Sequence, residues 1–165
     1  LEMSASNVKT THHRARNRLE ENRAHSSDMS DDERIQLIES LMKSLVEKDF
    51  ERLAELLTDD VEIRTDSGDG QFVANTRPIR GRHSVVHFME GVYQKSRIVE
   101  VRVAWLNQAP ALLVELDPTF DGQAPRTVIQ HGFADGRIGA SYVLLDNDKV
   151  GHVFENPDDP RRSKP

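Results

Sequence analysis

The histidines are the side chains in this sequence best suited to chemistry, because imidazole titrates near neutral pH and binds metal ions. His83 and His87 stand four residues apart, a spacing that places two imidazoles on one face of a helix. No Glu-x-x-His motif or third ligand accompanies them, so a metal site is not predicted. His131 lies in a β-rich stretch beside Gly132 and Phe133, where its side chain would point either into the core or into water. As a lone histidine, it fits a structural role better than catalysis.

Other catalytic and cofactor motifs are missing from the sequence. The chain has no cysteine, which excludes disulfides, thiol nucleophiles, zinc ribbons and iron–sulfur clusters. No glycine-rich phosphate loop followed by lysine occurs, and no G-x-S-x-G motif is present. The motifs therefore predict no cofactor, no metal ion and no catalytic residue.

Charge is distributed unevenly along the 165 residues, whose formal net charge is -6. In residues 1–25, five basic side chains oppose three acidic ones, so this head carries +2 and the rest of the chain carries -8. An acidic body is repelled by nucleic acid, whereas a basic head attracts phosphate. Only the head is therefore a candidate contact for DNA or RNA, with a solvated basic tail as the alternative.

The head has the pattern of a short helix. Ser4 or Ser6 can cap it, and Val8, Ala15 and Leu19 recur at helical spacing. Three apolar side chains cannot offset the cost of ordering twenty residues, so this helix must lean on another unit. We assign residues 1–20 to it and residues 21–29 to a polar linker.

The body, residues 30–154, changes from helical to strand periodicity along its length. A capping box of Ser30 and Glu33 starts one helix, a second begins at Phe50, and a third contains Val85 to Tyr93. Alternating patterns predict strands at residues 61–64, 71–74, 99–105, 111–116, 127–133 and 138–145. Residues 155–165 are expected to be a disordered tail. The predicted class is α+β, a bent antiparallel sheet packed on three helices and preceded by a separate N-terminal helix.

No apolar run reaches the length of a membrane span, and no signal-peptide pattern opens the sequence. We therefore expect a soluble cytoplasmic protein that makes no contact with membranes.

The order of elements resembles the cone-shaped nuclear-transport-factor-2-like fold, in particular its SnoaL-like group. Residues 48–61 are similar to the helix-to-strand passage of that group, as is Arg80-Gly81 before the third helix. The resemblance implies a cone that, in isomerases, cyclases, dehydratases and epoxide hydrolases, holds acids, a histidine or a tyrosine. The candidate pocket residues here are His87, Trp105, Gln130, His131 and Tyr142, with Asp60, Asp66, His83 and Tyr93 as further candidates. They form no spaced constellation.

The basic head, residues 4–16, resembles the recognition helix of region 4 in sigma-70 family factors, the last helix of a helix-turn-helix. The resemblance implies that polar side chains near the start of this helix contact base edges or position the helix on the DNA, and that its arginines neutralise phosphates. The implied DNA-binding residues are Ser6, Asn7, Lys9, Thr10, His13, Arg14, Arg16 and Arg18. The sequence starts where the turn of the motif should be, so we expect weak DNA binding without sequence preference.

Fusion of region 4 to a SnoaL-like domain is found in a subset of extracytoplasmic-function sigma factors, and the body resembles that subset. Residues 77–81 match its Arg-Pro-Ile-x-Gly, and residues 146–150 resemble its Asn-Pro-Asp-Lys-Leu motif. Residues 66–71 resemble its acidic, glycine-rich loop, with Gln71 in place of the lysine. The implied regulatory contacts are Asp66, Gly68, Asp69, Gly70, Gln71, Asn147, Asp148 and Lys149.

The sequence thus favours the regulatory C-terminal part of an alternative sigma factor over an enzyme. The implied partners are core RNA polymerase, the remaining sigma regions, promoter DNA in the full-length factor, and a second copy through the open sheet face. The alternative is a cone enzyme or a small-molecule sensor acting on an apolar ligand. Convergent polar groups and a perturbed acid inside the cone would favour that alternative, whereas an aliphatic interior would favour protein contact.

Overall fold

The computed structural model describes residues 29–68, 70–145, 150–151 and 153–154. The predicted recognition helix, nearly all of the predicted linker and the predicted tail lie outside these residues. The described helices and strands are α2 (Asp31–Glu47), α3 (Phe50–Glu55), β1 (Leu57–Asp66), β2 (Ile79–Arg80), α4 (Arg82–Lys95), β3 (Arg97–Leu106), β4 (Ala109–Asp117), β5 (Arg126–Ala134) and β6 (Arg137–Leu144).

The start and end of α2 follow from its capping residues. The Ser30 backbone N–H donates to Glu33 Oε2 at 2.7 Å, and the Glu33 N–H donates to Ser30 Oγ at 3.3 Å, which confirms the predicted capping box. Lys48 ends the helix in the left-handed region, with φ of 56°. Asp49 then caps α3 by accepting from the Arg52 N–H at 2.9 Å, so the chain turns sharply between the two helices.

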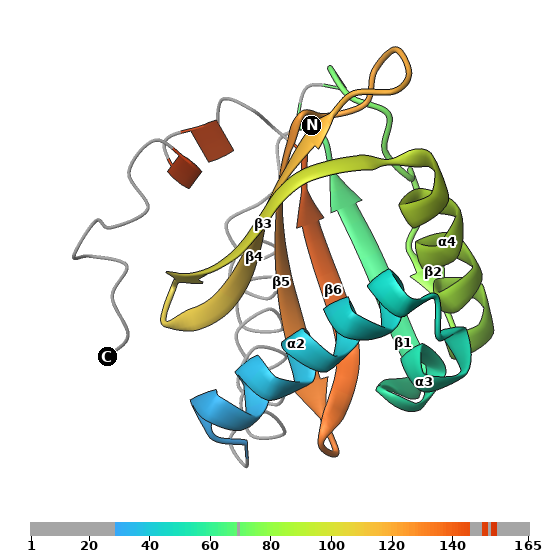
Figure 1. The fold of residues 1–165 in the computed structure, drawn as a ribbon, viewed down its shortest axis with the longest axis vertical. Helices are drawn as coiled ribbons and strands as arrows, with labels where there is room; N and C mark the ends of the chain where they lie inside the picture. Colours follow the sequence, from blue (N-terminus) through green and yellow to red (C-terminus); the bar gives the residue numbers. More distant parts are fainter. Residues whose placement is uncertain (1–28, 69, 146–149, 152, 155–165) are drawn as a thin grey trace, which may run out of the picture.

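The strands form a single curved sheet in the order β2-β1-β6-β5-β4-β3 (Figure 1). All neighbouring pairs are antiparallel except β1 and β6, which are parallel. The predicted wholly antiparallel sheet is therefore wrong at this pair. A parallel pair needs a long crossover, and the chain between β1 and β6 supplies one through α4 and four other strands.

The predicted strand at residues 71–74 is not formed. The Val73 N–H instead donates to the carbonyl of Gly122 at 2.9 Å, and Thr65 Oγ1 bonds Asn75 through both its N–H and its carbonyl. These contacts hold the segment against a neighbouring loop. The strand in this region is the two-residue β2, which pairs with Glu62 and Ile63 of β1. Pro78 immediately precedes this strand.

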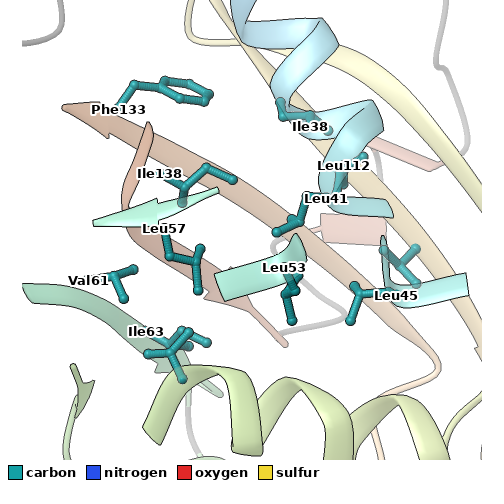
Figure 2. Close-up of a cluster of buried hydrophobic side chains, with 12 residues drawn as sticks. Ile38, Leu41, Leu45, Leu53, Leu57, Val61, Ile63, Leu112, Phe133 and Ile138 are labelled. Carbon is teal, nitrogen blue, oxygen red and sulfur yellow. The ribbon is translucent and has the colours of Figure 1, made fainter. Parts of the chain in front are cut away.

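The sheet has two faces that differ in what covers them. The inner face, as we call it, packs against α2, α3 and α4 through a core that includes Ile38, Leu53 and Leu112 (Figure 2). The outer face carries a second cluster, in which Ala111 and Leu113 meet Val150, Val153 and Phe154 from the C-terminal part of the chain. Leu112 and Leu113 belong to different clusters because successive side chains of a strand point to opposite faces.

None of the helices in the described part of the chain is both long enough and apolar enough to cross a membrane.

Candidate functional site

A buried polar pair lies within the largely apolar inner face. His131 of β5 is directly opposite Ser141 of β6, and His131 Nδ1 lies 2.9 Å from Ser141 Oγ in a hydrogen bond. Only 8% of His131 and 5% of Ser141 are exposed. The Phe133 ring, part of the inner core, is 6.4 Å from the imidazole, centroid to centroid. Of the two orientations open from the sequence, His131 therefore takes the one that points into the core.

Burial determines the chemistry available to this imidazole. Removal from water lowers the pKa of His131 from its ordinary 6.5 to about 4, because the charged form loses its hydration. The ring is therefore neutral at physiological pH. Its Nε2 has no hydrogen-bond partner among the described residues. This ring nitrogen can form one hydrogen bond with a ligand, but the imidazole is a weak base near neutral pH.

No acid accompanies His131 in the described core. The buried polar or charged side chains there are Ser44, Thr58, Thr127, His131 and Ser141. Two described acids have a shifted pKa, and both shifts are downward. The pKa of Glu33 is lowered mainly by the Ser30 backbone N–H, and that of Glu62 mainly by its hydrogen bond from Arg64. A general acid in an apolar cone needs a raised pKa instead, so the described inner face does not supply an acid–base pair.

Of the other candidate pocket residues, Trp105 shares the inner side of the sheet with His131, whereas Gln130 and Tyr142 face outward. Trp105 alternates with Ala104 and Leu106 of the outer cluster, so it belongs to the inner side of β3. Gln130 and Tyr142 lie opposite each other on the outer face, where the Gln130 amide donates to the Leu106 carbonyl at 2.9 Å.

The two histidines of α4 are both exposed. His83 and His87 therefore point away from the inner core, although the helix itself packs on it. Within the described ranges, no three His, Asp or Glu side chains are grouped closely enough to hold a metal ion.

The acidic glycine loop lies where β1 ends. Asp66 Oδ1 accepts from the Gly68 N–H at 2.8 Å, and Gly68 and Gly70 have φ of 65° and 86°, which glycine adopts without strain. The Leu145 N–H donates to the Asp66 carbonyl at 2.8 Å. Leu145, the last described residue before the predicted contact segment 146–149, is therefore hydrogen-bonded to the first residue of the loop.

Several predicted site residues lie outside the described part of the chain. They are Asp69, Asn147, Asp148 and Lys149 of the regulatory set, and Ser6, Asn7, Lys9, Thr10, His13, Arg14, Arg16 and Arg18 of the DNA-binding set.

A cluster around Phe154 on the outer face contains none of the predicted site residues. The Phe154 ring lies between two guanidinium groups, 5.7 Å from that of Arg102 and 5.4 Å from that of Arg126. Arg102 Nη2 also donates to the Phe154 carbonyl at 3.1 Å. The signal in the sequence was the apolar spacing of Val150, Val153 and Phe154, which is that of one helical face.

Comparisons with known proteins support the fold. No family model matches the sequence, and no curated protein matches it either. Among solved structures, an NTF2-like protein of unknown function from Cytophaga hutchinsonii aligns with a TM-score of 0.51 and 13% identity, covering 75% of this chain and 98% of that one. A provisionally assigned isomerase from Bacillus subtilis aligns with a TM-score of 0.52 and 13% identity, covering 77% and 96%.

A third solved structure is the extracytoplasmic function sigma factor SigJ of Mycobacterium tuberculosis. It aligns with a TM-score of 0.52 and 17% identity over 70% of this chain, but over only 42% of its own length. At these identities the likenesses show the fold alone: a curved NTF2-like sheet packed with helices.

Proposed function

We propose that this chain is a regulatory domain of an extracytoplasmic-function sigma factor, acting through contacts with other sigma regions or with core RNA polymerase. Its sequence resembles that subset in residues 66–71, 77–81 and 146–150. The likeness to part of SigJ, itself such a factor, is consistent with this proposal. The basic head supplies the segment that would contact promoter DNA in the complete factor.

The observation that carries the proposal is the backbone hydrogen bond from Leu145 to Asp66. Because of it, two sequence segments nearly eighty residues apart start from the same end of the sheet, where one partner could touch both. The loop there also leaves room for a partner backbone, since a Cβ placed on Gly70 would meet nothing within 4 Å. An approaching chain would find an acidic side chain and open backbone rather than an apolar groove.

The interior of the cone supports a role without bond chemistry. In the described core, mostly apolar side chains surround one neutral histidine, and no acid is buried beside it. Enzymes of this architecture need an acid or base whose pKa is matched to proton transfer. The contact surfaces of the proposed function therefore lie outside the cone.

Binding of the purified chain to core RNA polymerase and to the other sigma regions tests the proposal. The Asp66→Asn variant removes the charge and keeps an oxygen that can accept from Gly68. Glu39→Gln, at an exposed position of α2, makes the same change away from the loop. We expect wild type and Glu39→Gln to bind equally, and Asp66→Asn several-fold more weakly because a rim charge is lost. Failure of the wild-type chain to bind either partner would reject the proposal.

For the head, we propose weak DNA binding that depends on charge rather than sequence. A gel shift should give complexes that vanish as salt rises to about 150 mM, because few phosphates are neutralised. A specific sub-micromolar complex at that salt concentration would contradict this part of the proposal.

A second candidate, a small-ligand site or enzyme within the cone, is favoured by one observation. His131 Nε2 is buried without a hydrogen-bond partner among the described residues, and such atoms are normally satisfied by protein, water or ligand. Binding of 1-anilinonaphthalene-8-sulfonate to the folded chain, lost in His131→Phe, would support this candidate. Absence of binding to the wild-type protein would count against it.

A further inference from the structure

The edge of the sheet formed by β3 is long and carries exposed apolar side chains. β3 ends the strand order and pairs only with β4 among the described residues. The opposite edge is the two-residue β2, preceded by Pro78 and flanked by the Arg80–Glu62 ion pair. Short strands, prolines and charges are the usual protection of an edge. The β2 edge has all three, whereas β3 is ten residues long and contains no proline; its protection is limited to charges and one bulge.

The exposed apolar side chains of β3 surround its centre. Ile98 is 38%, Val99 65% and Val103 41% exposed. Val99 occupies a bulge, since Ile98 lies opposite Leu116 and Glu100 lies opposite Glu115. Branched apolar residues on a sheet edge are suited to burial against another strand. A strand added to this edge would cover Val99 and Val103.

The charges of β3 are arranged symmetrically about Val101. Glu100 and Arg102 flank it and point to the same face, because they are two residues apart in a regular stretch of strand. When two copies of a strand pair antiparallel about a twofold axis at Val101, Glu100 of each copy lies opposite Arg102 of the other. The same axis brings the bulge that contains Val99 beside Val103 of the other copy. Centring the pairing on Arg102 or on Glu100 would instead bring like charges together, which is destabilising.

We propose that the β3 edge is a homodimer interface, in which a second copy of this chain pairs antiparallel with β3 in the register centred on Val101. The occupant is a second copy because the edge is complementary to itself: each glutamate meets an arginine and each exposed valine lies beside another valine. The twofold axis is perpendicular to the sheet, so the inner faces of both copies lie on the same side.

The covering of the outer face favours this edge over the face as the site of self-association. Val150, Val153 and Phe154 pack on the middle of the outer face, and Arg102 and Arg126 hold Phe154 there. A dimer through that face would have to displace them. Pairing at β3 leaves the Phe154 contacts in place.

Sedimentation equilibrium of the full chain, at concentrations up to about 100 µM because edge interfaces are small and weak, tests the proposal. Glu100→Arg places two pairs of arginines opposite each other, and Val99→Lys puts charges at both ends of the paired stretch. Each should weaken dimerisation at least about tenfold, since two symmetric pairs change from favourable to unfavourable. The matched controls are Glu39→Arg and Val46→Lys on α2, where Val46 is 62% exposed. Both should dimerise like wild type.

Hydrogen exchange of the β3 backbone provides the second measurement. The amides of residues 99–103 that point away from β4 should become more protected as the protein concentration rises. A chain that is monomeric throughout, or a dimer that tolerates both Glu100→Arg and Val99→Lys, would overturn the proposal. Protection of these amides that does not depend on concentration would also overturn it, because another segment of the same chain would then cover the edge.

Discussion

The inner and outer faces of the sheet are built from different side chains although the same strands carry both. On β4, Leu112 joins the helix-covered core while Leu113 joins the cluster around Phe154. The inner face is mostly apolar, with Phe133 among its aliphatic side chains and His131, Ser141 and Thr127 as buried polar ones. The outer face combines its small apolar cluster with guanidinium groups, a glutamine and a half-exposed tyrosine.

This difference separates what stabilises the fold from what a partner can reach. The helices bury the inner face, so its side chains contribute mainly through the free energy of burial. The outer face and the loops that extend from the sheet keep their polar groups within reach of solvent. We infer that function in this chain acts from the outside of the cone.

The largest effect is expected from shortening an inner-face side chain. Leu53 of α3 is completely buried between α2 and the sheet. Leu53→Ala should lower the free energy of unfolding by about 2–5 kcal/mol, through lost burial and the cavity left behind. Urea denaturation measures this. Val46→Ala, at a mostly exposed site, is the control and should have a small effect. A loss at Leu53 as small as that of the control would show that the inner core is not closely packed.

Acid should also destabilise the inner face, through His131. Its pKa is about 4 in the folded chain against 6.5 ordinarily, so between these values the unfolded chain binds the additional proton. This contribution is fully present above pH 6.5 and is lost as the pH falls toward 4, by about 3 kcal/mol in total.

Denaturation at a series of pH values, comparing wild type with His131→Gln, isolates the histidine because the amide can still bond Ser141. The variant should show a shallower loss of stability in this window. Identical pH profiles for the two proteins would mean that the imidazole is not buried as a neutral group.

On the outer face, Phe154→Ala should have a smaller effect, because the contacts it removes hold only a C-terminal segment. We expect a loss of about 2 kcal/mol and faster hydrogen exchange at Val153, with β1 unchanged. Phe120→Ala, where the ring is 48% exposed, should change stability by less than about 0.5 kcal/mol. If the two variants behaved alike, the outer cluster would contribute nothing to holding the C-terminal segment against the sheet.

The smallest effect is expected at an exposed ion pair. Arg97 Nη1 lies 2.7 Å from Asp117 Oδ2, but both side chains are at least half exposed, so water and salt screen the attraction. Asp117→Asn should cost less than about 1 kcal/mol, and the cost should shrink further in 1 M salt. A large, salt-independent loss measured by thermal denaturation would contradict this view of the surface.

The sequence predicted the helices well because the signals that start and end a helix come from residues close together in the chain. The capping box at Ser30 and the break before Phe50 depend on residues three or four apart, and both are confirmed. Strand alternation likewise located four of the five long strands closely. The sequence predicted β1 only in its middle, since Leu57 continues the apolar spacing of the preceding helix.

Long-range contacts account for what could not be predicted. Residues 71–74 read as a strand, but the Gly122 carbonyl and Thr65 determine their path. The parallel pairing of β1 with β6 likewise leaves no local trace. At the candidate site, alternation alone could not say which face of β5 is covered by helices, so the orientation of His131 stayed open. The proximity of Asp66 to Leu145 depends on that same strand order.

Transcription in vitro by the complete factor proposed above tests most directly whether function lies outside the cone. Asp66→Asn alters the loop at the end of β1, and His131→Gln alters the buried polar pair while keeping a hydrogen-bonding side chain. The account predicts changed transcript yield with Asp66→Asn and wild-type yield with His131→Gln. The reverse pattern, in which only the buried substitution alters transcription, would contradict it.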